Sequence, residues 1–261
     1  MLIREPSPPQ IGRYAAPFVA VWGGLLLIAP FGFLRPGDLM AGDPLLGTLV
    51  RSVAFATVST AVACVIGLRV GTRLADGAAG PLVRFGVDLP LMLPPVVVGF
   101  CLLALFRGPL AWIDRLTPIV AEPLGIFVAQ TTVAVALASR FVESAVSGVD
   151  PRLSAAAASL GHSPDRVWRA VRIAESWRGL LASVAVVWAQ TFGSFGPVLV
   201  LAGVTRGRTE VLPTAVYLEM TSGEIGRAAA VVLVMAGIGG AATLAASLAD
   251  VRRGERLRIQ A

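Results

Sequence analysis

Six long apolar segments, separated by shorter polar stretches, dominate the hydrophobic pattern of this chain. Each segment is close to the roughly 20 residues that an α-helix needs to cross a bilayer. The pattern predicts an all-α integral membrane protein, built as a single transmembrane domain over residues 1–261. The six transmembrane helices are expected at about Tyr14–Leu34, Thr48–Val70, Phe85–Phe106, Pro123–Ser144, Gly179–Gly203 and Ile225–Ala249.

Two of these segments contain residues that break a helix. The third carries Pro90, Pro94 and Pro95, which remove backbone hydrogen bonds and kink the helix. Within a bilayer the freed carbonyls must face protein or a cavity, so the break points to a pathway, with a purely structural kink as the alternative. The fifth segment carries polar and small residues from Gln190 to Pro197. They indicate a pathway wall, although small residues also serve close helix packing.

A polar stretch at about 145–178 interrupts the apolar pattern between the fourth and fifth segments. Asp150 and Pro151 form a helix start signal, and Gly161 suits a left-handed stop. Ser163 and Pro164 then repeat the start signal. The stretch therefore predicts two short helices around a glycine. From composition alone, an incidental basic loop is an equally good interpretation.

Composition and charge agree with a membrane protein. The chain is 56% hydrophobic and 15% charged, whereas soluble domains carry about 25% charged residues. We expect no cleaved signal in the tail Met1–Arg13, no structural disulfide between Cys64 and Cys101, and no metal site. In the fourth segment, Arg140 and Glu143 can pair on one helix face as an inner-end anchor, and a gating role stays open.

All basic residues are arginines, and their distribution predicts the orientation. With the N-terminus inside, 15 of the 22 arginines lie on the inner side and 7 on the outer side. By the positive-inside rule both termini and the stretch at 145–178 are cytoplasmic. The net charge of +6 then fits anionic lipid headgroups, and no nucleic-acid partner is expected.

The polar stretch resembles the cytoplasmic coupling loop of ABC importer permeases, whose pattern runs Glu-Ala-Ala, then Gly, then Ile-x-Leu-Pro. Ala156, Ala157 and Gly161 match this pattern, whereas Ala155 replaces the acid and Ala174 replaces the proline. The resemblance implies that this loop docks on an ATPase. The residues that it assigns to coupling are Ala156, Ala157, Leu160, Gly161, His162, Ser163 and Pro164.

The third and fifth segments resemble those of molybdate-type permeases, and the likeness extends over roughly Thr48–Arg227. Ser194 stands where these permeases carry an acid, and the loop from Arg206 to Pro213 resembles their outer loop. Arg206 and Arg208 could meet an arriving anion there, or be ordinary surface charges. The resemblance assigns the translocation path or gate to Pro94, Pro95, Gln190, Thr191, Gly193, Ser194, Phe195 and Gly196.

The resemblance implies the type I, MetI-like ABC permease fold and a transporter subunit of the bacterial plasma (inner) membrane. The substrate implied is molybdate or tungstate, with sulfate, thiosulfate or another anion as the alternative. The partners implied are a second copy of the chain, an ATPase dimer that binds ATP and Mg, a periplasmic or extracellular binding protein, and the lipid bilayer.

A non-ABC membrane enzyme or scaffold is the rival class. An intramembrane enzyme should show catalytic groups at depth, such as paired acids or a Ser-Lys pair, and the sequence shows none. The chain has no lysine and therefore no Walker-type phosphate loop, so it is expected to bind no cofactor itself. An ATPase and a secreted binding protein encoded next to the chain would decide for the transporter.

Overall fold

A computed structural model describes residues 23–34, 42–161, 163, 167 and 172–258, and all regular structure among them is helical. The described part begins with an apolar helical segment, Gly23–Phe33, whose last part is the 3-10 helix η1 (Ala29–Phe33). The other helices are α2 (Gly42–Ala75), α3 (Pro81–Met92), α4 (Pro95–Arg107), α5 (Ala111–Leu116), α6 (Pro123–Ser147), α7 (Pro151–Ser159), α9 (Ala174–Phe192), α10 (Gly196–Ala202), α11 (Leu212–Thr221) and α12 (Ile225–Arg258).

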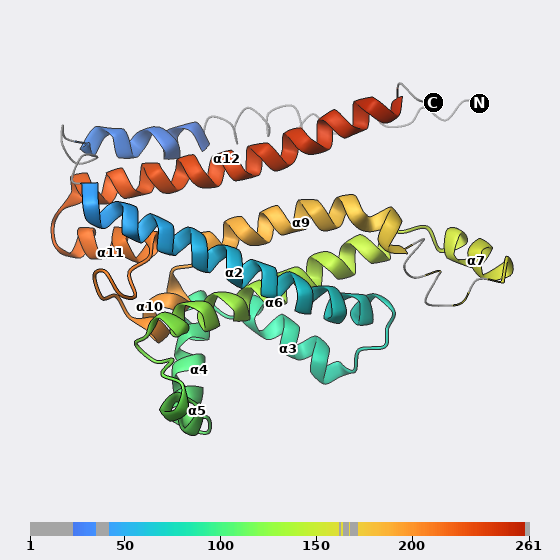
Figure 1. Cartoon of the computed structure of the whole chain (residues 1–261), viewed down its shortest axis with the longest axis horizontal. Helices are drawn as coiled ribbons and strands as arrows, with labels where there is room; N and C mark the ends of the chain where they lie inside the picture. The colour runs from blue at the N-terminus through green and yellow to red at the C-terminus, as the bar shows by residue number, and fades with distance from the viewer. Residues whose placement is uncertain (1–22, 35–41, 162, 164–166, 168–171, 259–261) are drawn as a thin grey trace, which may run out of the picture.

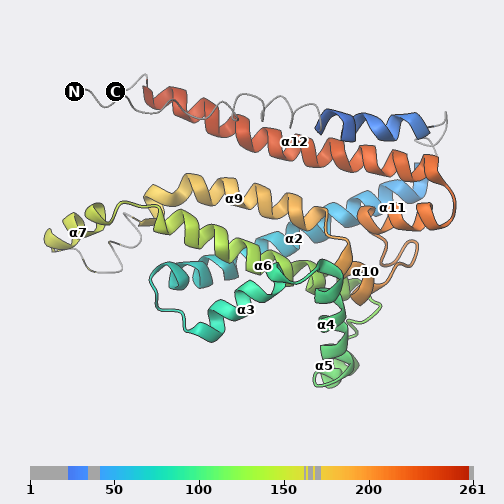
Figure 2. The ribbon, with the colours of Figure 1, turned by 180° about the vertical axis from the view of Figure 1, so that it is seen from behind.

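The centre of the bundle is α6, which packs against α2, α3, α9 and α10. Figures 1 and 2 show α2, α6 and α9 running side by side, with α12 and the N-terminal helical segment along one side. Helix α7 lies at one end of this bundle and α11 at the other. Helices α4 and α5 project away from it beside α10 (Figure 1). We refer below to the α7 end and the α11 end.

Helices α2 and α6 approach most closely near the α7 end. A β-carbon added to Gly67 would lie 2.6 Å from the Ala138 Cβ, and one added to Gly71 would lie 2.4 Å from the Ser139 carbonyl oxygen. No larger residue fits there without moving one helix. Small residues at such crossings are how membrane helices maximise contact, because lipid supplies no hydrophobic driving force between them.

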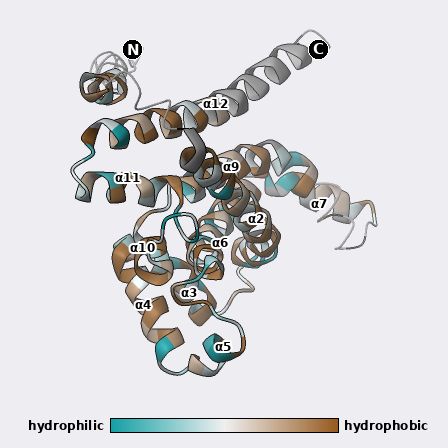
Figure 3. Cartoon of the chain, turned by 60° about the vertical axis from the view of Figure 1, so that its left-hand side comes forward, coloured by the Kyte–Doolittle hydropathy of each residue, from teal (hydrophilic) through white to brown (hydrophobic). Residues whose placement is uncertain are grey.

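The buried apolar residues form separate small clusters where helices cross. One surrounds α10 and includes Ile126, Val198 and Leu201, and another joins α2, α9, α11 and α12. Large apolar side chains outside the clusters remain exposed, among them Phe100 and Leu82. Figure 3 shows hydrophobic residues dominating α4 and α10, whereas hydrophilic residues appear at α5. An apolar surface of this extent suits a protein surrounded by lipid.

Three helices of the described part are long and apolar enough to cross a membrane, Leu45–Ala75, Pro123–Ser147 and Ile225–Ala242. They confirm the predicted second, fourth and sixth spans. The predicted fifth span is bent by 51° between α9 and α10, and counts as a fourth crossing if the pair is one span. The predicted third span is divided into α3 and α4. Part of the predicted first span lies outside the described residues, so the total of six stays a prediction.

Helix α5 is fixed to the start of α6 by one carboxylate. Asp114 Oδ1 accepts hydrogen bonds of 2.8 Å from the backbone N–H groups of Ile119 and Val120. These bonds, from Val120 first and Ile119 second, lower the pKa of the Asp114 carboxyl, because they favour its charged form. The connection between the two helices is therefore held by backbone groups that would otherwise be unpaired.

Candidate functional site

Two interrupted helices meet beside α6. Helix α3 ends at Met92, and α4 begins at Pro95 after an extended Pro94 (φ −54°, ψ 139°). Proline donates no backbone hydrogen bond, so the Pro94–Pro95 pair ends the ladder of α3 and starts a new helix. Helix α9 ends at Phe192, and Pro197 opens α10. Gly99 of α4 and Gly196 let the two helices touch, since a β-carbon at either would lie 2.9 Å from backbone of the other helix.

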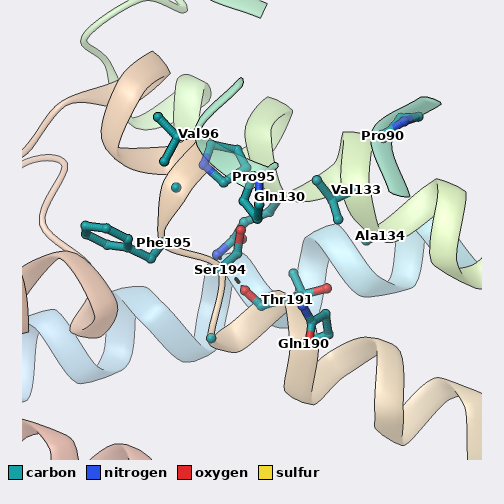
Figure 4. Close-up of a pocket in the computed structure, with 13 residues that line it drawn as sticks. Pro90, Pro95, Val96, Gln130, Val133, Ala134, Gln190, Thr191, Ser194 and Phe195 are labelled. Atoms are coloured by element: carbon teal, nitrogen blue, oxygen red, sulfur yellow. Dashed lines mark hydrogen bonds between the residues drawn. The ribbon is translucent and has the colours of Figure 1, made fainter. Parts of the chain in front are cut away.

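The two interruptions enclose a cavity of about 300 Å³ between α3, α4, α6, α9 and α10. Figure 4 shows Ser194 and Thr191 near its middle, Phe195 on one side and Pro90 on the opposite side. The lining residues are Pro90, Pro95, Val96, Gln130, Val133, Ala134, Gln190, Thr191, Gly193, Ser194, Phe195, Gly196 and Pro197.

Every residue assigned to the path in the sequence lines this cavity, with the exception of Pro94. Pro94 instead caps α4, where its carbonyl accepts hydrogen bonds from the N–H groups of Val97 (2.9 Å) and Val98 (3.2 Å). The sequence did not reveal the contribution of α6, which supplies Gln130, Val133 and Ala134. A glutamine inside an apolar span was a visible signal, but its partner helices could not be identified from spacing.

Gln130 is the polar residue that joins the helices around the cavity. Its side chain is buried, its Oε1 accepts a hydrogen bond from Ser59 Oγ (3.2 Å), and its Nε2 donates to the Thr191 carbonyl (3.2 Å). That carbonyl belongs to the last turn of α9, where backbone groups lose their helical partners. Gln130 therefore connects α2 and α6 to the interrupted end of α9.

The cavity is polar without being charged. Its hydrogen-bonding side chains are the amides of Gln130 and Gln190 and the hydroxyls of Thr191 and Ser194. Such groups can exchange hydrogen bonds with a partly hydrated solute at modest affinity. No acid, base or thiol lines the cavity, and no group of metal ligands occurs among the described residues.

Ion pairs join α3 to α6 close to the cavity. The predicted Arg140–Glu143 pair on α6 is confirmed, and Arg140 also binds Asp88 of α3. Arg84 of α3 binds Glu143 at 3.2 Å. We call these four residues the α3–α6 ion-pair network. The sequence showed the pair within α6 but gave no reason to expect Arg84 and Asp88 as partners.

The segment assigned to coupling lies at the α7 end, away from the cavity. The predicted cap is confirmed, since Asp150 Oδ1 accepts a hydrogen bond from the Arg152 N–H (2.9 Å). Gly161 has a φ of +80°, the left-handed conformation expected of it. Ala156, Leu160 and Ser163 are exposed and Ala157 is half-buried. His162 and Pro164 lie outside the described residues.

The loop between α10 and α11 carries arginines that are already paired. Arg206 binds Glu219 at 2.9 Å, and Arg208 binds Glu122 at the start of α6. Arg51 of α2 donates to the carbonyls of Glu210 and Gly207, both at 2.8 Å. The contacts favour the interpretation of Arg206 and Arg208 as structural surface charges over that of free anion receptors.

Two curated relatives are similar to this chain over most of its length. A probable molybdenum ABC transporter permease protein of Haloferax volcanii is 34% identical over 83% of this chain and 83% of its own. The molybdenum transport system permease protein ModB of Mycobacterium tuberculosis is 35% identical over 66% of this chain and 67% of its own. No family model matches the chain.

Two solved structures share the fold. A chain of the MetNI methionine ABC transporter, solved in inward-facing conformations, has a TM-score of 0.60 at 20% identity and covers 78% of this chain and 99% of its own. A chain of an amino acid ABC transporter has a TM-score of 0.59 at 15% identity, with 82% of this chain and 94% of its own covered. At these identities the likeness concerns the fold alone, and the fold is the ABC transporter fold that the resemblance implied.

Proposed function

Because the chain belongs to the family of molybdenum ABC transporter permeases, we propose that it is the membrane-spanning subunit of an ATP-driven importer of molybdate or tungstate. The observation that carries this proposal is the 34% identity to a molybdenum permease over 83% of both chains. The subunit performs no catalysis of its own. Its proposed role is to carry an oxyanion through the bilayer and to couple that passage to ATP hydrolysis in a partner.

The cavity is the proposed passage for the anion. It lies between two interrupted helices, and its neutral hydrogen-bonding groups, such as Gln190 and Ser194, can replace part of a hydration shell. A fixed positive charge there would hold a divalent anion too strongly for release, since conduction requires binding weak enough to leave. Two copies of the chain would place their α9–α10 interruptions around one central path.

We call α7 and the turn that follows it at Gly161 the α7 segment. ATP-driven closure of an ATPase pair is proposed to act through this segment. Its exposed Leu160 and the turn at Gly161 form a protruding surface at the α7 end. ATP and Mg would bind to the ATPase, and a binding protein would deliver the anion at the α11 end. Closure of the ATPases would then shift the helices between two states that expose the path to opposite sides.

The proposed location is the plasma (inner) membrane with both termini in the cytoplasm. The support is the arginine asymmetry, 15 against 7 of 22. A cysteine in place of Leu160, which is 78% exposed, should react with a membrane-impermeant thiol reagent from the cytoplasmic side of sealed vesicles. Reaction from the opposite side alone would overturn both the orientation and the coupling role.

Co-purification tests the function most simply. The chain should co-purify with an ABC ATPase from its own organism, and molybdate with the cognate binding protein should stimulate ATP hydrolysis. Stimulation by sulfate or thiosulfate in place of molybdate would instead assign the chain to the other anion group. Absence of any associated ATPase would favour a membrane enzyme or scaffold.

A further inference from the structure

Helix α3 is a short rod between two joints. On one side the connection from α2 turns at Gly77, which has a left-handed φ of +68°. On the other side the chain is interrupted at Leu93 and Pro94, and both adopt extended conformations. Interruptions at both ends let a helix move as a unit, because the dihedral changes are confined to a few residues.

The apolar contacts that hold α3 are few. Within α3, which is described throughout, Val87 is the buried residue, and it packs in a small cluster with Leu74 and Ala136. Leu82, Phe85 and Met92 are exposed. By contrast with α3, helix α2 is packed closely on α6 at Gly67 and Gly71. These two helices cannot separate or slide without losing a tight fit.

The α3–α6 ion-pair network supplies the charged attachment of α3 to α6. Arg140 contacts both Asp88 and Glu143, and Arg84 contacts Glu143 and the Leu74 carbonyl. The side chains of Arg140, Asp88 and Glu143 are 28%, 32% and 17% exposed. The two positive and two negative charges balance. Such partly buried pairs contribute modestly, because their attraction is offset by loss of hydration and by screening.

The network lies directly between the cavity and the α7 end. Along α3, Asp88 precedes the cavity residue Pro90 by two positions. Along α6, Arg140 follows the cavity residue Ala134 by six positions, about 9 Å along a helix axis. Arg140 and Asp88 therefore lie next to the cavity on the side of the α7 end.

A further ion pair connects the segment before α3 to the segment before α9. Arg172, two residues before α9 begins, binds Asp76 in the connection that leads into α3. A shift at the start of α9 would move the joint at the start of α3 through this pair. The cavity end of α3 would then move against Arg140 of α6.

We propose that α3 is a movable inner gate and that the α3–α6 ion-pair network holds it closed. The proposal rests on the proposed function as a transporter. Arg140 and Asp88 are thus positioning residues for transport, and they perform no chemistry.

Access to the cavity from the cytoplasm tests the gate. Val133 lines the cavity, so Val133→Cys in a background of Cys64→Ser and Cys101→Ser reports on access by a charged thiol reagent in inside-out vesicles. Asp88→Asn should raise the labelling rate roughly tenfold, equivalent to the loss of about 1.4 kcal/mol that holds the gate closed. Asp88→Glu, which keeps a carboxylate opposite Arg140, should leave the rate close to that of the parent.

Arg107→Gln is the matched control, because it removes an ion pair (3.8 Å to Asp114) remote from the cavity and should leave the labelling rate unchanged. Equal labelling of Asp88→Asn and the parent would overturn the gate, as would labelling of Asp88→Glu as fast as that of Asp88→Asn. Lower thermal stability with unchanged labelling would show a purely structural network. Labelling needs neither ATPase nor anion, so loss of the proposed function and loss of the gate remain distinguishable.

Discussion

Close contact between α2 and α6 depends on residues without a side chain. A β-carbon at Gly71 would meet the Ser139 carbonyl at 2.4 Å and Val142 Cβ at 2.6 Å. Gly71→Ala should therefore lower the free energy of unfolding by about 1–3 kcal/mol through overpacking. Thermal unfolding of the purified protein in detergent measures this effect.

Gly47 provides the control on the same helix, because nothing lies within 4 Å of a β-carbon added there. Gly47→Ala should be neutral or stabilise by up to about 1 kcal/mol, since alanine has the higher helix propensity. If both substitutions behave alike, the close α2–α6 approach is not what limits stability.

Gly161 is the residue on which the coupling interpretation depends. Its φ of +80° and open surroundings mean that Gly161→Leu introduces strain of about 1–2 kcal/mol at the turn and adds bulk to its surface. Membrane insertion should survive, because the turn lies at the end of the bundle. We expect a normal protein level with loss of ATPase co-purification and of uptake.

Gly207→Leu is the matched substitution, with a φ of +74° and equally open surroundings, in the loop before α11. The backbone strain is the same, so a difference between the variants reports on docking alone. Retention of full ATPase binding by Gly161→Leu would remove the α7 segment from the coupling role.

The interrupted helices determine where a translocation path can lie. If two copies meet around the α9–α10 interruption, Ser194→Cys in a background of Cys64→Ser and Cys101→Ser should cross-link two chains in membranes. Ser194 lines the cavity, and it follows the end of α9 by two residues. Cross-linking only from cysteines within Gly23–Phe33 would show that the chains meet elsewhere.

The interruptions themselves were predictable from the sequence, and their meeting was not. Proline interrupts the hydrogen bonds of its own helix, so Pro94, Pro95 and Pro197 predict helix breaks whatever other helices pack against them. Which helix completes the cavity depends on packing across the fold, so Gln130 of α6 was assigned no role. For the same reason, only one of the two partners of Arg140 was predictable. Glu143 lies three residues away on the same helix, whereas Asp88 comes from another helix.

The whole molecule joins two separated regions, the cavity between the interrupted helices and the α7 segment at the end of the bundle. Family membership could be predicted from the sequence, because the motifs around Pro95, Gly161 and Gly193 follow one another in the order typical of molybdate-type permeases. The ion pair between Arg172 and Asp76, which joins the segments that lead into α9 and α3, required the structure. In the proposed mechanism, transport requires α3 to move relative to α6.

Uptake into proteoliposomes is the most direct test of this account. The chain, its ATPase and its binding protein would be reconstituted together, and radioactive molybdate would be supplied on the side of the binding protein. The account predicts accumulation of molybdate that requires ATP and the binding protein, and that excess tungstate suppresses more strongly than excess sulfate. Accumulation without ATP, or none with a complete system that hydrolyses ATP, would contradict it.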